Sequence, residues 1–126
     1  MRVHISIPVN DLGKSEAFYS HLFGQPASKE KPDYINFRLD QPAIHLALVK
    51  SESVSKQRGT EHFGIELPTE ETFRSWENRL TASGPEMAQP EPGAQCCYAK
   101  ADKVWLSDPD GNRWEIWHRT GDHFSM

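Results

Sequence analysis

The stretch MRVHISIPVNDLGKSEAFYSHLFG, residues 1–24, decides how the chain begins to fold. Apolar side chains alternate with other residues along positions 3–9, which is typical of a strand with two different faces. Asp11 is a preferred residue just before a helix, and apolar residues at helical spacing predict a helix over residues 12–23. Gly24 is suited to end that helix, because glycine readily adopts the left-handed conformation found at helix C-termini.

The same order of elements returns in the second half of the chain. His62 stands near the start of another alternating stretch, residues 61–67, and Thr69 precedes a second pattern with helical spacing. His4 and His62 are 58 residues apart, and the same separation holds for Asp11 and Thr69. The two histidines are therefore predicted to occupy equivalent places in two similar units.

Three strand-like runs follow each predicted helix. In the first half they cover residues 27–31, 34–39 and 43–50, and in the second half residues 95–100, 103–107 and 113–119. Gly84 is expected to end the second helix, proline-rich residues 85–93 to form a loop, and polar residues 51–59 to form a linker. The predicted fold class is α/β (α+β), with paired βαβββ modules at about residues 1–50 and 60–119. We expect one domain over residues 1–126, in which two curved sheets enclose a metal-binding cup.

Composition limits the classes of partner. The chain has 126 residues and a net charge of −4, and it lacks the clustered Lys and Arg that binding to nucleic acid requires. No apolar stretch approaches the roughly 20 residues that span a bilayer, and no secretory signal is evident. We expect a cytoplasmic protein that binds neither nucleic acid nor membrane. Its adjacent cysteines, Cys96 and Cys97, would then be thiols.

Alternation along the last predicted strand adds a carboxylate to the candidate metal ligands. Glu115 and Trp117 share one face of that strand, and Trp114 and Ile116 share the other. If the first face lines the cup, Glu115 can meet His4 and His62. Two imidazoles and one carboxylate form the facial triad of non-haem Fe(II) sites, although the same ligands also suit Mn(II), Co(II) and Ni(II).

Residues 4–12 (HISIPVNDL), 18–24 and 108–112 (DPDGN) resemble motifs of the vicinal oxygen chelate superfamily. That family includes glyoxalases, extradiol dioxygenases, and bleomycin and fosfomycin resistance proteins. The resemblance covers essentially the whole chain. It implies the paired βαβββ fold, and it implies metal ligation and a catalytic role for His4, His62 and Glu115.

One ligand position differs from the glyoxalase pattern. Glyoxalase-like members use a fourth ligand, usually a Glu, on the last strand of the first half, whereas residues 43–49 contain no carboxylate. His45 lies near the equivalent place, and we expect it to face outward or to hydrogen-bond a neighbour. The missing carboxylate argues against a glyoxalase, and the intact triad argues against a pure binding module.

The run Cys96-Cys97-Tyr98-Ala99-Lys100, followed by DKVW at 102–105, resembles the signature of organoarsenical carbon–arsenic lyases and related cadmium-induced proteins. The resemblance implies Fe(II)-dependent, dioxygenase-type cleavage of the carbon–arsenic bond in trivalent methyl or aryl arsenicals, with release of arsenite. Cys96, Cys97 and Tyr98 would bind the substrate, and dioxygen would be the second reactant.

Strand geometry constrains the cysteine pair. Adjacent residues of a regular strand point to opposite faces, so two sulfurs can hold one arsenic atom only where the backbone departs from strand form. We therefore expect both cysteines in or beside a mobile loop. Lys100 and Lys103 either lower the pKa of the thiols by their positive charge or are solvated surface residues.

Two other functions remain open at this point. The first is a thiol-based arsenic- or cadmium-binding resistance protein without turnover. The second is an extradiol-type dioxygenase, for which the cysteine pair would be dispensable. The sequence leaves open the preference for methyl or aryl arsenicals, and it leaves open whether the modules also pair between chains in a homodimer.

Overall fold

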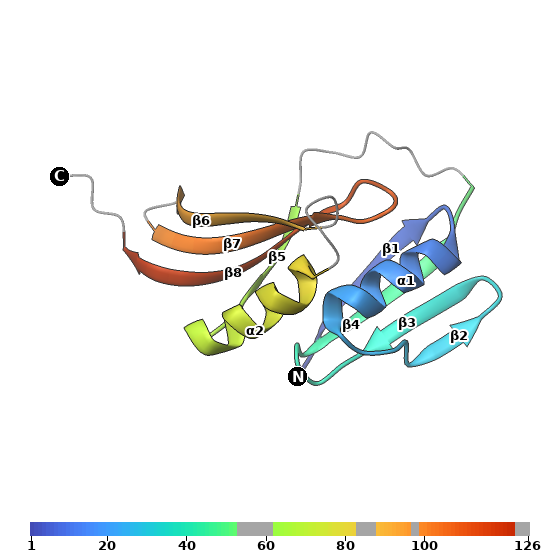
Figure 1. Cartoon of the computed structure of the whole chain (residues 1–126). Coiled ribbons are helices and arrows are strands. Elements are labelled where there is room, and N and C mark those ends of the chain that lie inside the picture. The colour runs from blue at the N-terminus through green and yellow to red at the C-terminus, as the bar shows by residue number, and fades with distance from the viewer. Residues whose placement is uncertain (53–61, 83–87, 97–98, 123–126) are drawn as a thin grey trace. The chain divides into compact units, whose positions relative to one another are not determined.

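A computed structural model describes residues 1–52, 62–82, 88–96 and 99–122 (Figure 1). The chain divides into two compact units. The first unit comprises residues 1–59 and 108–111, and the second comprises residues 60–107 and 112–126. Among the described residues, no helix is both long and apolar enough to cross a membrane. That the two units act as one domain stays a prediction.

The first unit is a four-stranded sheet with one helix on it. Its elements are β1 (Val3–Val9), α1 (Leu12–Phe23), β2 (Lys29–Lys31), β3 (Tyr34–Arg38) and β4 (Ile44–Lys50). The strand order is β1-β4-β3-β2, with β1 parallel to β4 and the other neighbours antiparallel. Helix α1 lies along one face of this sheet (Figure 1).

Helix α1 begins and ends as its sequence predicts. The side chain of Asp11 accepts a hydrogen bond from the backbone N–H of Lys14 at 2.9 Å, which satisfies one of the unpaired donors of the first turn. Gly24 ends the helix with a φ of 65°, a conformation that costs glycine little. The buried face of α1 packs on apolar side chains of the sheet, and the core includes Phe18, Tyr19, Leu22, Phe23, Ile35, Phe37, Leu46 and Leu48.

The first unit also contains a turn from the far end of the sequence. Tyr19, which is fully buried, donates its hydroxyl hydrogen bond to Oδ2 of Asp108. The backbone N–H of Asn10 donates to Oδ1 of Asp110 at 3.1 Å. Gly111 adopts a φ of 88°, which lets the chain turn tightly. The predicted turn over residues 108–112 is therefore present, and residues 108–111 belong to the first unit.

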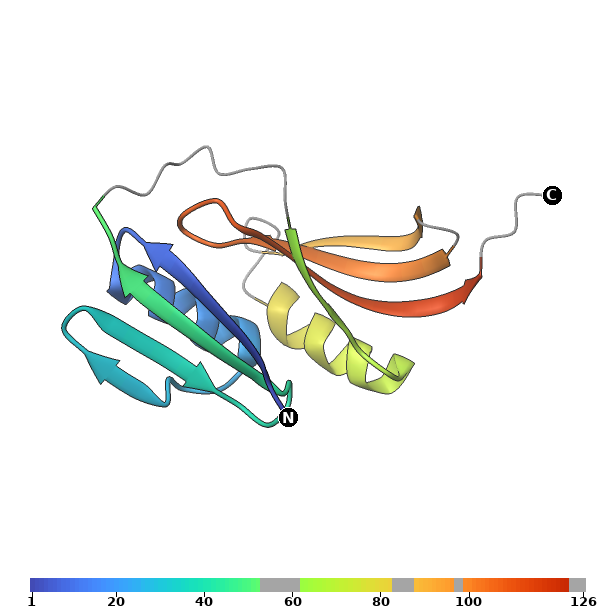
Figure 2. The ribbon, with the colours of Figure 1, turned by 180° about the vertical axis from the view of Figure 1, so that it is seen from behind.

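The second unit repeats the order of elements. It contains β5 (His62–Glu66), α2 (Glu70–Thr81), β6 (Gln89–Cys96), β7 (Ala99–Ser107) and β8 (Arg113–Asp122). The strand order is β5-β8-β7-β6, with β5 parallel to β8. Figure 2, which views the chain from the opposite side, shows α2 beside this sheet. The predicted fold class, with βαβββ present twice, is confirmed.

Helix α2 is capped as expected but ends early. The hydroxyl of Thr69 accepts a hydrogen bond from the backbone N–H of Thr72 at 3.1 Å, and Phe73 and Leu80 form its buried stripe. The helix stops at Thr81 rather than next to Gly84, and Gly84 lies outside the described residues.

The prediction of a proline-rich loop over residues 85–93 is wrong for residues 89–93, because these belong to β6. Residues 85–87 lie outside the described part of the chain. Strand β6 is at the edge of its sheet, where proline is tolerated because its nitrogen can face away from the one neighbouring strand. A bulge between Glu91 and Ala94 accommodates Gly93, which has a φ of 65°.

The predicted break between residues 100 and 103 is also absent. Strand β7 runs continuously over Ala99–Ser107. Asp102 is paired inside the unit: Oδ2 accepts from Arg74 at 2.8 Å, and Oδ1 accepts from the backbone N–H of Gly93 at 2.8 Å. The carboxylate is thus satisfied without leaving the strand.

Candidate metal-binding site

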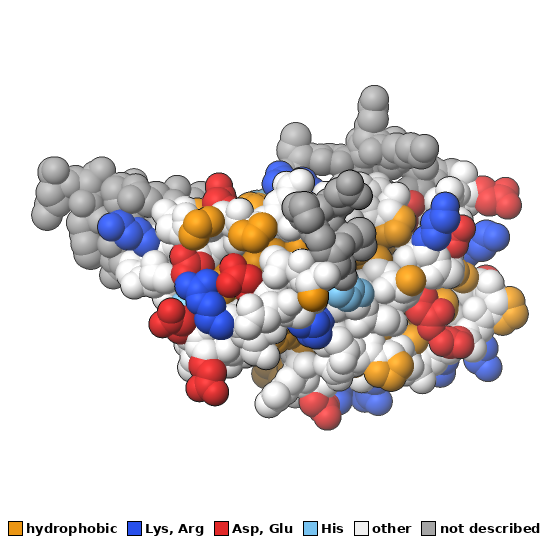
Figure 3. Space-filling model, in the orientation of Figure 1, with side chains coloured by type: hydrophobic (Ala, Val, Ile, Leu, Met, Phe, Trp, Pro, Cys, Tyr) orange, Lys and Arg blue, Asp and Glu red, His pale blue; other side chains and the backbone are white. Residues whose placement is uncertain are grey.

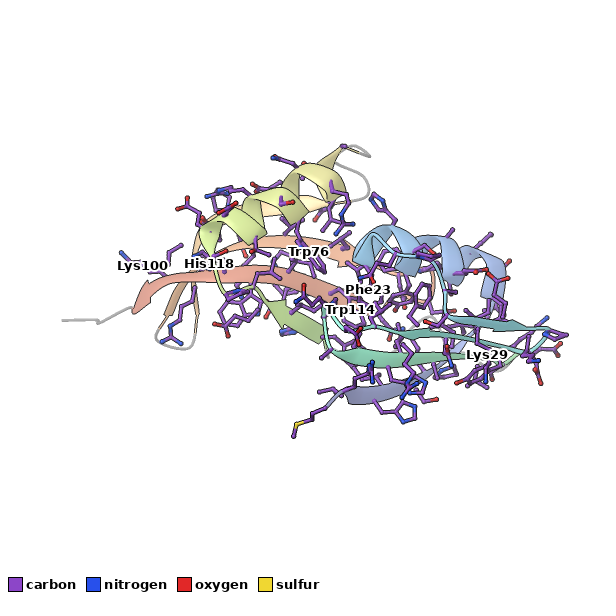
Figure 4. The ribbon with its side chains drawn as sticks, turned by 90° about the horizontal axis from the view of Figure 1, so that it is seen from below. Phe23, Lys29, Trp76, Lys100, Trp114 and His118 are labelled. Carbon is purple, nitrogen blue, oxygen red and sulfur yellow. The ribbon has the colours of Figure 1, made fainter. Side chains whose placement is uncertain are left out.

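Glu115 lies on the face of sheet β5-β8-β7-β6 that points away from the core. Trp114 and Ile116 are fully buried on the opposite face, and the ring of Trp114 packs on Phe63 at 5.0 Å between ring centres. His118 continues this inner face, because its ring lies 6.5 Å from that of Phe73 on α2 (Figure 4). The predicted alternation along β8 is therefore present.

His62 and Glu115 approach each other across β5 and β8. Nε2 of His62 is 3.6 Å from Oε1 of Glu115, and the His62 side chain is 45% exposed. Two ligand atoms bound to one ion at about 2.1 Å each, at angles of about 90–110°, are about 3.0–3.5 Å apart. The observed separation is close to that range. These two side chains fit a divalent metal ion.

Gly64 gives the carboxylate the room that it needs. It pairs with Glu115 in the parallel register of β5 and β8. A Cβ atom at Gly64 would lie 3.0 Å from both Cγ and Oε1 of Glu115, and 3.4 Å from Nε1 of Trp117. The Glu115 side chain therefore lies directly against the backbone of β5, and a larger residue at position 64 would push it away.

Lys103 is a member of this cluster that the sequence reasoning missed. Its Nζ atom lies 2.9 Å from Oε2 of Glu115, so its charge is directed to that carboxylate. It is not a solvated surface lysine. The signal was available: across a hairpin centred on residues 108–112, β7 and β8 pair Lys103 with Trp117 and Trp105 with Glu115. Lys103 is thus a diagonal neighbour of Glu115 on the same face.

Trp105 forms the wall of the cluster next to His62. The two rings meet edge to face with centres 5.3 Å apart. Nε1 of Trp105 donates to Glu91 at 3.1 Å, and the guanidinium of Arg113 lies 4.3 Å from the Trp105 ring centre. These contacts fix the indole plane, so the side of His62 facing β7 is apolar.

The first unit contributes a separate pair of histidines. His4 and His45 are paired across β1 and β4, and their rings stack with centres 4.4 Å apart. Nε2 of His45 lies 3.4 Å from Nδ2 of Asn36, in agreement with the expectation that His45 contacts a polar neighbour. Burial first, then the nearby His4 and Arg38, lower the pKa of His45. The lowered pKa favours the neutral form of the His45 imidazole.

The remaining predicted site residues are only partly described. Cys96 is the last residue of β6, and its backbone pairs with Ala99 of β7. Cys97 and Tyr98 lie outside the described residues. Within either unit, the described part of the chain brings together no group of three or more His, Cys, Asp or Glu side chains suited to a metal. The triad of His4, His62 and Glu115 therefore stays a proposal.

The order βαβββ, present once in each unit, defines a protein of the class built from two such modules. The chain belongs to the Glyoxalase/Bleomycin resistance protein/Dioxygenase superfamily, whose pattern matches residues 2–116. A solved member, a glyoxalase/bleomycin resistance protein/dioxygenase from Alicyclobacillus acidocaldarius, superposes with a TM-score of 0.77 at 18% identity. The match covers 95% of this chain and 92% of that one.

Two curated relatives are more similar in sequence. A trivalent organoarsenical cleaving enzyme of Bacillus sp. (strain MD1) is 40% identical over 116 residues, which cover 91% of this chain and 71% of the relative. The cadmium-induced protein CadI of Mycobacterium bovis is 37% identical over 117 residues, which cover 92% of this chain and 74% of the relative.

Proposed function

We propose that this chain is an Fe(II)-dependent enzyme that cleaves the carbon–arsenic bond of trivalent organoarsenicals and releases arsenite. The observation that carries the proposal is the 40% identity to a trivalent organoarsenical cleaving enzyme along 91% of the chain. The adjacent thiols of Cys96 and Cys97 give a chemical reason for that substrate, because trivalent arsenic is soft and thiophilic and two thiolates can chelate it.

His4, His62 and Glu115 would hold the metal ion. Bound Fe(II) would supply the activation of dioxygen that an oxidative cleavage needs. The protein's part is placement. Glu115 is held between Gly64 and Lys103, and the edge-to-face contact with Trp105 orients His62.

Cys96 and Cys97 would bind arsenic through their sulfur atoms, and Tyr98 would contact its organic substituent. A methyl or aryl arsenical keeps two valences for the two sulfurs. For methylarsonous acid the reaction balances as CH₃As(OH)₂ and O₂ giving As(OH)₃ and formaldehyde. Carbon loses four electrons to dioxygen, and one oxygen atom enters each product.

The test is a turnover assay under controlled oxygen. The chain is loaded with Fe(II) without air, mixed with methylarsonous acid, and then exposed to isotopically labelled dioxygen. We expect arsenite and formaldehyde in equal amounts, with label in the formaldehyde, and no product from Glu115→Gln or from the Cys96→Ser, Cys97→Ser double variant. Formaldehyde exchanges its oxygen with water, so its label is trapped by rapid reduction to methanol.

Two outcomes would favour the other functions. Tight, thiol-dependent binding of the arsenical without arsenite release would indicate a resistance protein that sequesters arsenic. Similarity to a cadmium-induced protein supports this alternative. Ring cleavage of a catechol that survives loss of both cysteines would indicate an extradiol-type dioxygenase.

A further inference from the structure

Lys103 is held more tightly than a surface lysine. Its side chain and that of Glu115 are each 11% exposed, and Nζ lies 2.9 Å from Oε2. The same ammonium group lies 5.5 Å from the ring centre of Trp105 and 5.8 Å from that of Trp117. A lysine is rarely this buried unless it is paired, and aromatic faces attract a cation at such distances. Three groups therefore fix the position of its charge.

The two oxygens of Glu115 have different neighbours. Oε2 faces the ammonium of Lys103, whereas Oε1 faces Nε2 of His62 at 3.6 Å. Oε1 also lies next to the backbone of β5, where a Cβ at Gly64 would approach it to 3.0 Å. The carboxylate thus has little freedom to turn, and only the oxygen beside the imidazole is directed to a second candidate ligand.

We propose that Lys103 is a positioning residue that makes Glu115 bind its metal ion through Oε1 alone. The inference rests on the proposed function only in taking Glu115 as a metal ligand. A charge-assisted hydrogen bond to Oε2 is strong in a setting this sheltered. It keeps that oxygen engaged, so Glu115 supplies one ligand atom instead of two.

One ligand atom fewer leaves one coordination position more for substrate and dioxygen. The lysine also places a positive charge close to a dication, which weakens metal binding. Removing the lysine should therefore increase two quantities, the affinity for the metal and its coordination number. The metal should bind more tightly, because repulsion is lost and Oε2 becomes available, and its coordination number should rise.

Co(II) is the probe, because its visible absorption reports coordination number and its binding is measured without turnover. For Lys103→Met we expect Co(II) affinity to rise by at least about ten-fold, because repulsion between a unit charge and a dication about 5 Å away has that size even in bulk water. We expect its visible bands to weaken, as they do when coordination number rises. Lys103→Arg keeps charge and donors, so it should resemble the wild type in both measurements.

Lys14→Met is the matched control. Lys14 is exposed on α1 of the first unit, so this variant loses the same charge from a solvated position, and it should bind Co(II) as the wild type does. If Lys103→Met matches the wild type in affinity and spectrum, this inference is overturned and the proposed metal site stands. If the wild type itself binds no Co(II), both are overturned.

A measurement on the wild type covers the case in which Lys103→Met does not fold. Infrared difference spectra between Zn(II)-loaded and metal-free protein report the two carboxylate stretches of Glu115, assigned by their loss in Glu115→Gln. Binding through one oxygen should give a wide separation between these bands. A narrow separation, typical of binding through both oxygens, would overturn the inference.

Discussion

Tyr19 carries a buried polar contact between residues 89 positions apart in the sequence. Replacing Tyr19 with phenylalanine removes only the hydroxyl group, which donates the hydrogen bond to Asp108. A hydrogen bond to a charged group contributes about 1.5–3 kcal/mol. We expect Tyr19→Phe to lower the free energy of unfolding by about that amount, measured as a lower urea midpoint at an unchanged slope.

Tyr34→Phe serves as the control for that experiment. Tyr34 is only half-buried, and its hydroxyl accepts a 3.1 Å hydrogen bond from Asn36. Its loss should cost less than about 1 kcal/mol, as for an ordinary neutral hydrogen bond. Equal losses in the two variants would show that the Tyr19 contact with Asp108 has no special role in stability.

Gly64 is the residue on which the position of Glu115 most directly depends. In Gly64→Ala the new methyl group would lie 3.0 Å from Glu115, so the carboxylate must move. Changes that misplace a ligand typically cost about 10–100-fold in metal affinity. We expect a loss in that range for Co(II), measured by competition with a chelator.

Gly121→Ala is the matched control for Gly64→Ala, because a Cβ there would meet nothing within 4 Å. This variant should bind Co(II) as the wild type does. If both variants bind equally well, Glu115 does not depend on close contact with β5.

At this scale the sequence predicted side-chain faces better than contacts. Period-two alternation placed Glu115 and Trp117 opposite Trp114, and the structure agrees. It did not predict the ion pair of Lys103, because that diagonal contact follows only after β7 and β8 are paired about the turn at residues 108–112. The substrate role of Cys96 and Cys97 came from resemblance and stays a prediction.

Among the elements, the helices were the most predictable. Asp11 and Thr69 each cap a helix through a side-chain oxygen, and such caps act within one turn of sequence. Strand β6 was missed because Pro90, Pro92 and Gly93 indicate a loop in any local reading. Its place at the edge of the sheet depends on which strands pair, and a local sequence pattern does not specify strand pairing.

Glu16 on α1 and Glu30 on β2 form a like-charged contact between two elements. A hydrogen bond that the protonated Glu16 carboxyl donates to Glu30, followed by burial and by the negative charge of Glu30, raises the pKa of Glu16 above its ordinary value. The folded state therefore holds a proton that the unfolded state has released, so stability falls as pH rises from about 4.5 through the raised pKa.

Glu16→Gln should lack this decline. At neutral pH we expect it to be more stable than the wild type by a few tenths of a kcal/mol, since the site is partly solvated. Urea unfolding at a series of pH values measures the difference. Glu52→Gln, at an exposed position, should keep the wild-type slope, and a wild-type slope in Glu16→Gln would contradict the coupling.

At the scale of the whole molecule, the proposed triad takes one ligand from the first unit and two from the second. His4 lies on β1, whereas His62 and Glu115 lie on β5 and β8. If one ion binds all three side chains, it links the first unit, which contains β1–β4, to the second unit, which contains β5–β8. Metal binding then becomes a contribution to the stability of the entire chain.

A ligand that binds only the folded state at 100 times its dissociation constant adds about 2.7 kcal/mol of stability. We therefore expect Co(II) at that excess to raise the unfolding temperature of the wild type by roughly ten degrees. His4→Ala and His62→Ala should each remove most of the rise, whereas His21→Ala, on α1, should keep it. A full rise in His4→Ala, with loss only in His62→Ala, would mean that the second unit holds the ion alone.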